Sequence, residues 1–299
     1  MADKFTRKQF QAQYPDDAAC LLAILERRYG KADACPKCGV VGTLTRIEGR
    51  RAFACKEGCH TYPCAGTIFE HSPTPLTDWF YAMYLMTATR NGVSGKELER
   101  QLGVTYKCAW RIGHQLRILM STRAKAQNPG PLSGHVELDE TYIGGKGRVR
   151  GKGTGKGNYL RNKAVVFGLV QRDGTLRSHV VPNELSATLL PIVQANVAPG
   201  TKISTDLAGQ YKPLKRLGYD HQRVNHQIDE WVRGDIHTNT IEGFWSHLKR
   251  GIKSTHASVS KKHLQKYIDE FAFRFNNREA PAEMFQRLLR HVSRAESFS

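Results

Sequence analysis

The chain has 299 residues, with 45 Lys and Arg against 27 Asp and Glu, so its formal net charge is +18 at pH 7. A positive charge this large destabilises a compact fold unless a polyanion offsets it, and its clustering along the chain favours nucleic acid over an anionic membrane as the partner. No apolar run approaches the roughly 18 residues of a membrane span and the first residues lack a secretory signal, so we expect a cytoplasmic protein, with a large α/β domain preceded by one or two small modules.

The first predicted element is a helix over residues 8–29, within an N-terminal segment that we assign to residues 1–30. Gly30 is a typical helix stop. One face of the helix is apolar, which predicts that it packs against a core. The residues of this face are Leu21, Leu22, Ile24 and Leu25.

Residues 31–72 have the cysteine pattern of a zinc ribbon. Two pairs of cysteines flank a gap of sixteen residues, and in a chain with seven cysteines and no export signal such pairs favour metal binding over disulfides. The expected zinc ligands are Cys35, Cys38, Cys55 and Cys59. The second pair has three intervening residues instead of the usual two, so His60 or Cys64 could replace Cys59.

Residues 73–125 predict a module of three helices. The first ends before Asn91-Gly92, and its core-facing residues are Trp79, Met83 and Met86. The second begins with a capping box formed by Ser94 and Glu97 and ends near Leu102-Gly103.

The third helix begins at Thr105 and is basic. Two short helices joined by a glycine-containing turn, the second of them basic, resemble a helix-turn-helix whose second helix contacts DNA. We therefore expect Lys107 and Arg111 to bind DNA, and Trp110 and Leu116 to lie in the core.

A linker over residues 122–134 separates this module from a strand-rich α/β domain, which we assign to residues 131–280. A C-terminal helix and tail follow at 281–299. The first strand is predicted at residues 135–139. Its apolar residues should face the core while its acidic residues, Glu137 and Asp139, point the other way, with Asp139 at the end of the strand.

Residues 144–163 consist almost entirely of Gly, Lys, Arg and polar residues. Such a loop cannot pack a core, but its cations and backbone amides suit phosphates. The residues expected to bind DNA here are Lys146, Arg148, Arg150, Lys152 and Lys156.

Further strands are predicted at residues 163–170 and 176–181, joined by a turn at Asp173-Gly174, followed by a helix over 189–196 and a short strand over 201–205. Asp206 comes directly after the last of these strands. A second carboxylate is therefore expected at the end of a strand.

A third acidic candidate lies near the start of a predicted helix. Asn239 and Glu242 have the spacing of a helix cap and its partner, which explains both residues without any chemistry. Lys249, however, follows Glu242 by seven residues and so lies about 20° from it on the same helix face. Thirty-five residues separate Asp206 from Glu242.

This order of Asp, Asp and Glu, with the 35-residue interval and the trailing Lys, resembles the catalytic acids of retroviral integrases and insertion-sequence transposases. The resemblance to one family of bacterial insertion-sequence transposases, which carry a zinc ribbon, covers nearly the whole chain. The segments that carry it are residues 136–146, 205–211, 224–226, 237–250 and 260–278, with Cys-Pro-Lys-Cys-Gly and Gly66-Thr67-Ile68-Phe69 in the ribbon.

The resemblance implies a ribonuclease H-like mixed sheet with flanking helices, and the activity of a DDE transposase, which is both a nuclease and a polynucleotidyl transferase. Asp139, Asp206 and Glu242 match the catalytic acids. Asn239 is kept as an alternative third ligand, because related families use Asn in place of the third acid. Two Mg²⁺ or Mn²⁺ ions about 4 Å apart would bind the acids and offset the charge of the transition state.

In such an enzyme Lys249 would meet a phosphate near the scissile bond, and His226 and His237 could assist. Water would free a 3′-hydroxyl, which would then attack the target DNA. The implied partner is double-stranded DNA, both the element ends and the target, so the protein would associate with the bacterial nucleoid. Joining two ends requires at least a dimer on DNA.

Two other functions remain open. A zinc-ribbon DNA-binding regulator without catalysis would explain the ribbon and the charge, but it would leave the three acids as a coincidence. A host nuclease of the same fold would cut DNA without joining it. The last long helix, residues 261–277, has a stripe of aromatic residues four apart, which we assign to the core: Tyr267, Phe271 and Phe275.

Overall fold

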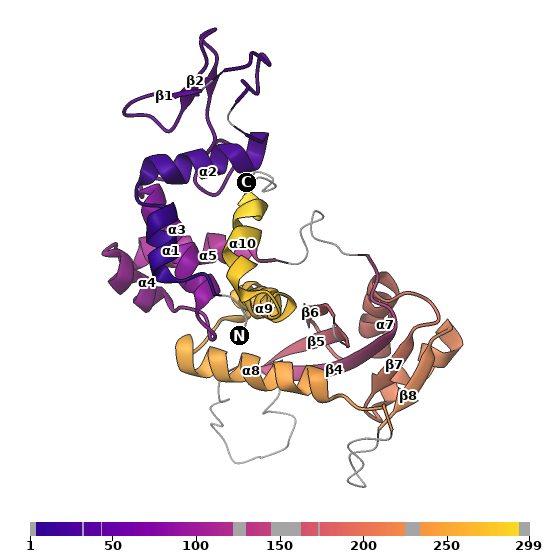
Figure 1. Cartoon of the computed structure of the whole chain (residues 1–299). Helices are drawn as coiled ribbons and strands as arrows, with labels where there is room; N and C mark the ends of the chain where they lie inside the picture. Colours follow the sequence, from indigo (N-terminus) through magenta and orange to yellow (C-terminus); the bar gives the residue numbers. More distant parts are fainter. Residues whose placement is uncertain are drawn as a thin grey trace. The chain divides into compact units, whose positions relative to one another are not determined.

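The computed structural model describes residues 4–31, 33–42, 44–121, 130–144, 163–172, 174–224 and 234–292. The chain forms two compact units: unit 1 contains the residues up to Met120 and those from Asn277 onward, and unit 2 runs from Ser121 to Asn276. It thus leaves unit 1, builds unit 2 and returns (Figure 1). Within these described ranges no helix has the length and apolar character needed to cross a membrane.

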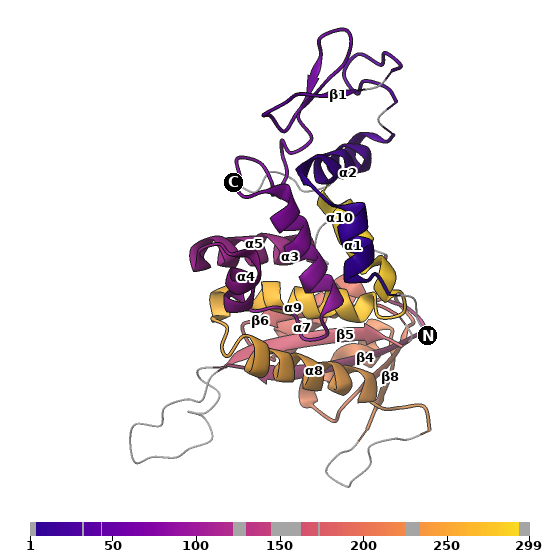
Figure 2. The same ribbon diagram turned by 60° about the vertical axis from the view of Figure 1, so that its left-hand side comes forward.

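Unit 1 is held together by aromatic residues from both ends of the sequence. The ring of Phe285 lies 5.8 Å from Phe10, 5.3 Å from Tyr14 and 6.0 Å from Phe80, measured between ring centroids. The last helix therefore shares a core with the first ones (Figures 1 and 2). The helices of this unit are α1 (Arg7–Gln13), α2 (Asp17–Tyr29), α3 (Leu76–Ala88), α4 (Gly95–Leu102), α5 (Tyr106–Leu119), η4 (Pro281–Glu283) and α10 (Met284–Val292).

The single helix predicted at residues 8–29 is wrong, because the chain forms two helices there. Pro15 disfavours a helical conformation at the residue before it, and α1 ends at Gln13. The second helix then has its own cap, since the Asp16 side chain accepts a hydrogen bond from the Ala19 amide at 2.8 Å. Of the predicted apolar face, Leu22 is exposed and the other three residues are buried.

The zinc-ribbon segment folds as a small antiparallel sheet in the order β1-β2-β3. Its strands are β1 (Thr45–Arg46), β2 (Phe53–Ala54) and β3 (His60–Thr61). Strands this short bury little apolar area, so the sheet alone contributes little stability.

The helix pair α4 and α5 forms as predicted, with two differences. Ser94 accepts a hydrogen bond from the Glu97 amide at 3.0 Å, but the Glu97 carboxylate is bonded by Arg100 and Gln101, so only half of the capping box forms. Trp110, expected in the core, is 36% exposed. Its ring stacks on that of His114, with 4.4 Å between centroids, which supports an aromatic residue at the surface.

Unit 2 is built on a five-stranded sheet in the order β6-β5-β4-β7-β8. β5 is antiparallel to both of its neighbours, whereas β4, β7 and β8 are parallel to one another. The strands are β4 (His135–Ile143), β5 (Ala164–Gln171), β6 (Leu176–Val181), β7 (Lys202–Thr205) and β8 (Asp220–Arg223), the last of which the sequence pattern did not predict.

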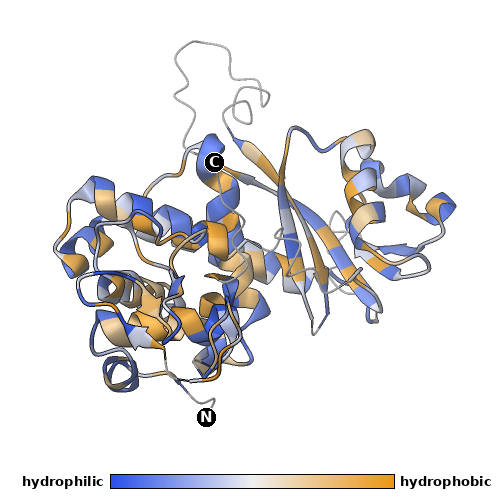
Figure 3. Ribbon diagram, turned by 90° about the horizontal axis from the view of Figure 1, so that it is seen from above, coloured by the Kyte–Doolittle hydropathy of each residue, from blue (hydrophilic) through white to orange (hydrophobic). Residues whose placement is uncertain are grey.

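Helices cover both faces of this sheet, as the expected ribonuclease H-like architecture requires. One face packs against α7 (Ser186–Asn196) and the 3₁₀ helix η2 (Gly209–Leu217), and the other against α8 (Asn239–Thr255) and α9 (Lys261–Asn276). α8 runs across β4 and β5 in both ribbon views (Figures 1 and 2). Hydrophobic residues, drawn in orange, recur along the strands and helices with hydrophilic residues between them (Figure 3). The aromatic stripe predicted on α9 is fully buried at Phe271 and partly buried at Tyr267 and Phe275.

One expectation about the first strand of this sheet is wrong. β4 extends to Ile143, so Asp139 lies in the middle of the strand, paired with Gly168 of β5, and not at its end. Glu137 points away from Val136 and Leu138 as predicted, and it is fully buried because α8 covers that face of the sheet. Asp206, in contrast, directly follows β7 as predicted.

Candidate active site and metal centres

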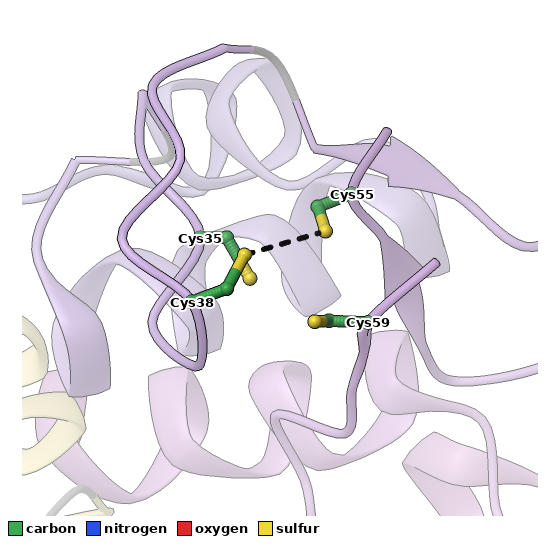
Figure 4. Close-up of side chains that lie close together, drawn as sticks. All are labelled: Cys35, Cys38, Cys55 and Cys59. Carbon is green, nitrogen blue, oxygen red and sulfur yellow. Dashed lines mark hydrogen bonds between the residues drawn. The ribbon is translucent and has the colours of Figure 1, made fainter. Parts of the chain in front are cut away.

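The four cysteines predicted to bind zinc lie together in the ribbon. Their sulfur atoms are all within 4.8 Å of one another, and the sulfur atoms of Cys38 and Cys55 are 3.8 Å apart (Figure 4). A tetrahedral zinc ion with Zn–S bonds of about 2.3 Å requires sulfur atoms about 3.8 Å apart. Among the described residues this is the only group of three or more His, Cys, Asp or Glu side chains gathered closely enough to hold a metal ion.

The fourth position of this group belongs to Cys59, and neither alternative takes it. His60 is exposed and Cys64 is buried outside the group, where burial raises the pKa of its thiol to about 11. Within the group, backbone hydrogen bonds from Cys38 and Lys37 lower the pKa of Cys35 to about 7, whereas contacts with the thiols of Cys38 and Cys55 raise the pKa of Cys59 to about 12. Crowded thiols ionise together only when a cation offsets their charge.

In unit 2, the two predicted aspartates come together at the centre of the sheet. β4 and β7 are parallel neighbours, and Asp139 on the first lies close enough to Asp206, just after the second, for their charges to interact. Burial, followed by the charges of Glu140 and Asp206, raises the pKa of Asp139 to about 7. An isolated carboxyl at this site thus resists ionisation, and a bound cation would reverse that effect.

Glu140 ties the segment after Asp206 to β4. Its carboxylate accepts hydrogen bonds from the Gln210 amide group at 3.0 Å and from the hydroxyl of Tyr211, both in η2. Burial raises the pKa of Glu140, and burial together with the Glu140 charge raises that of Tyr211 well above its ordinary value. The sequence analysis assigned no role to Glu140, although its position next to Asp139 indicated that it could lie near the site.

α8 reaches the first aspartate through a tryptophan. The indole Nε1 of Trp245 donates a hydrogen bond to the Asp139 carboxylate at 2.9 Å. The close approach depends on Gly168, since a Cβ atom there would lie 2.6 Å from the Trp245 ring and 2.8 Å from the Ile241 side chain. A larger residue at this position of β5 would push α8 away from the acid.

Glu242 lies one helical turn before Trp245 and is half-buried. Its carboxylate accepts a hydrogen bond from the Thr238 hydroxyl at 2.6 Å, and it does not join the two aspartates in a single tight group within the described part of unit 2. Asn239 is the first residue of α8, not its cap, and is exposed. Lys249 is exposed on the same helix, two turns beyond Glu242.

The cap of α8 comes from another part of the chain. The Glu137 carboxylate accepts hydrogen bonds from the amides of Thr240 and Ile241, at 2.9 and 3.1 Å. His237, predicted as a possible catalytic helper, has its Nδ1 3.2 Å from the same carboxylate. No local sequence pattern could have found a cap that lies a hundred residues away.

Of the residues predicted to bind DNA, those on α5 are at the surface. Lys107 and Arg111 are exposed, together with Tyr106 and Trp110, and all four lie in the first two turns of the helix. The five cationic residues predicted to bind DNA between residues 145 and 162 lie outside the described residues, as does His226.

Two domain families match the chain. Residues 131–276 match the ISXO2-like transposase domain, and residues 15–62 match the transposase zinc-ribbon domain. Two solved structures of Mos1, the strand transfer complex and a pre-cleavage transpososome, are 14% and 12% identical, with TM-scores of 0.29 and 0.28. The match with each structure spans 74% of this chain, and it spans 78% and 79%, respectively, of the Mos1 chains.

Two relatives also match the chain in sequence. A protein of the transposable element ISH50 from Halobacterium salinarum is 32% identical over 275 residues, which cover 86% of this chain and 89% of that protein. A transposase-like protein from Haemophilus influenzae is 35% identical over 105 residues, 35% of this chain and 84% of that protein. The chain therefore belongs to the family of insertion-sequence transposases that combine a transposase zinc-ribbon domain with an ISXO2-like transposase domain.

Proposed function

We propose that this transposase binds the ends of its insertion sequence, cleaves DNA there and joins the freed 3′-hydroxyl to a target. The observation that carries the proposal is the meeting of Asp139 and Asp206 at the centre of the sheet, where burial and the charges of Glu140 and Asp206 raise the pKa of Asp139 to about 7. A partly buried carboxylate beside a second one costs free energy unless a charged ligand offsets it.

The two aspartates have the chemistry of magnesium or manganese ligands, and Glu242 would have to join them when the ions bind. Hard divalent cations prefer carboxylate oxygens, and Asp139 and Asp206 offer these oxygens while the Trp245 indole orients one of them. Asp139, Asp206 and Glu242 would together hold the ions. When bound, such ions stabilise the charge of the attacking and leaving oxygens of a phosphodiester. Lys249, exposed beyond Glu242 on α8, would bind a phosphate beside the scissile bond.

Either Glu242 or Asn239 supplies the third ligand, and the structure supports the first. Glu242 is half-buried and one turn from Trp245, whereas Asn239 is exposed at the start of the helix. Glu242→Gln should lower the rate of cleavage by at least about a hundredfold, and Asn239→Ala should change it less than tenfold. The reverse order of effects would make Asn239 the ligand.

The exposed side chains at the start of α5 support a role in binding the element ends. Lys107 and Arg111 can meet phosphates, and Tyr106 and Trp110 offer aromatic surface beside them. Removing either cation should weaken binding and reduce its salt dependence by about one counterion. Lys107→Ala and Arg111→Ala are expected to show this in titrations at several salt concentrations, with Arg290→Ala, an exposed arginine in the same unit, as the control.

We also propose that the ribbon holds one structural zinc ion through its four cysteines, and that at least two copies of the chain assemble on DNA. The first follows from sulfur spacing that fits a tetrahedral ion. The second follows from the reaction, since concerted joining requires two element ends to be held together. Zinc content by elemental analysis and the mass of the DNA complex by light scattering would test the two claims.

The decisive experiment is cleavage and strand transfer with labelled element ends in Mg²⁺. The wild-type protein should cut, and a pre-cleaved end with a free 3′-hydroxyl should be joined to target DNA. Asp139→Asn and Asp206→Asn should abolish both reactions, whereas Asp220→Asn, an exposed aspartate of β8, should retain them. Binding without cleavage by the wild type would favour a DNA-binding regulator, and cleavage without joining would favour a nuclease.

A further inference from the structure

The carboxylate of Glu137 is a buried charged group that the proposed chemistry does not use. It is fully buried, on β4 two residues before Asp139, and so on the same face of the strand. Its oxygens accept hydrogen bonds from the Arg172 Nε at 2.8 Å and from the Thr240 hydroxyl at 3.0 Å. The two α8 amides and His237 described above complete its surroundings.

These contacts replace the cap that α8 lacks. The first amides of a helix have no acceptor within the helix, and Thr238, the N-cap residue, makes no side-chain cap hydrogen bond. Glu137 accepts two of these amides and adds a negative charge where the helix dipole favours one. The start of α8 is therefore capped by a residue of β4 and not by a residue next to the helix in the sequence.

A second contact fixes the same helix to the same strand. The Trp245 indole donates to Asp139, two residues along β4 from Glu137. Glu242 lies between the two attachment points, after Ile241 and before Trp245. The rotation and height of this part of α8 relative to β4 are thus determined by one carboxylate on each side of Glu242.

Arg172 extends the attachment to the segment before the helix. Besides Glu137, its guanidinium donates to the backbone carbonyl of His237 at 3.1 Å and to that of Asp235. Arg172 follows β5 directly, so the approach to α8 is bound to two adjacent strands.

We infer that Glu137 is a positioning residue that sets Glu242 in register with Asp139, so that the third acid can complete the metal site. This inference rests on the proposed function, in which Glu242 holds a divalent cation. The side chain of Glu137 acts through α8 and does not touch the metal or the DNA.

The test compares Glu137→Gln with Glu270→Gln. Both substitutions remove a buried carboxylate that pairs with an arginine, but Glu270 pairs with Arg274 within α9, away from the start of α8. Mn²⁺ binding to the zinc-loaded, full-length protein is measured by electron paramagnetic resonance, and amide hydrogen exchange reports on Thr240 and Ile241. Second-sphere substitutions of this kind typically weaken metal binding roughly 10- to 100-fold.

The expected result is that Glu137→Gln weakens Mn²⁺ binding by about that factor and speeds exchange at the two amides, with cleavage partly restored at saturating Mn²⁺. Glu270→Gln should lower the melting temperature without changing the Mn²⁺ affinity more than twofold. Should Glu137→Gln fail to fold, Thr240→Val, which removes only one hydroxyl donor to the carboxylate, should weaken binding severalfold.

Unchanged Mn²⁺ affinity in Glu137→Gln, despite faster exchange at the start of α8, would overturn the inference and leave Glu137 as a structural cap only. The proposed function has a separate control. If Asp139→Asn leaves Mn²⁺ binding unchanged, the metal site itself is misassigned; if Asp139→Asn abolishes binding and Glu137→Gln does not affect it, only the positioning role fails.

Discussion

The raised pKa of Asp139 predicts that the metal-free protein becomes more stable when this candidate catalytic acid is removed. A carboxyl whose pKa is higher in the folded state binds more protons there, so stability decreases as the pH rises from the unfolded to the folded value. The folded pKa of about 7 lies about three pH units above the ordinary 3.8, and each unit corresponds to about 1.4 kcal/mol. Charging Asp139 above pH 7 therefore costs on the order of 4 kcal/mol.

Asp139→Asn removes this cost and keeps an oxygen that can accept from the Trp245 indole. Without added magnesium at pH 8, we expect the variant to unfold with a free energy higher by up to about 4 kcal/mol. The difference should fall to about 2 kcal/mol at pH 5, where the folded wild-type carboxyl is almost fully protonated but the unfolded one still ionises. The measurement is urea unfolding of the zinc-loaded protein in buffer without magnesium. No chelator is added, because a strong chelator would also remove zinc from the ribbon.

Magnesium should reverse the order of the two proteins. Ligand binding stabilises the wild type in proportion to the logarithm of the metal concentration, whereas the variant should gain little. Asp220→Asn, at an exposed position, should show neither the pH dependence nor the altered metal response. A variant no more stable than the wild type at pH 8 without magnesium would refute the reasoning, since Asp139 would then ionise without cost.

Two further predictions concern packing and zinc. Gly168→Ala should destabilise the protein by about 1–3 kcal/mol and slow cleavage, because the new methyl group displaces the Trp245 ring and breaks its hydrogen bond to Asp139. Gly209→Ala is the control and should do neither, because no atom lies within 4 Å of the added carbon. Cys59→Ser should lower the zinc content and melt the ribbon while Cys64→Ser retains one equivalent of zinc, and an equal loss in both variants would contradict the assignment of Cys59.

The sequence predicted the clustered cysteines of the ribbon well because their spacing is local. Two knuckles of a ribbon each form within a few residues, so even the unusual second pair could be assigned to Cys59. The helix pair α4 and α5 was predictable for the same reason, with a serine and a threonine as caps and a glycine at the turn between them. Trp110 was misplaced because helical periodicity does not reveal which face a neighbouring element leaves open.

The position of Asp139 within β4 was not predictable, and the reason is physical. A run of acidic and hydroxyl residues is typical of the end of a strand, because buried polar groups need partners. Here the partners of Glu137 and Glu140 come from α8 and η2, which follow them by about a hundred and about seventy residues. Alternation along one strand cannot show that distant donors will cover both of its faces.

The return of the chain to unit 1 bears on the order in which the protein is completed during synthesis. Phe285 enters the aromatic core shared by Phe10 and Phe80 only after all of unit 2 has left the ribosome. A product truncated after Asn276 would keep every candidate catalytic acid but would lack α10. The aromatic core would then be incomplete, and α3 and α5 would lose their contacts with α10. An incomplete chain therefore lacks a finished unit 1.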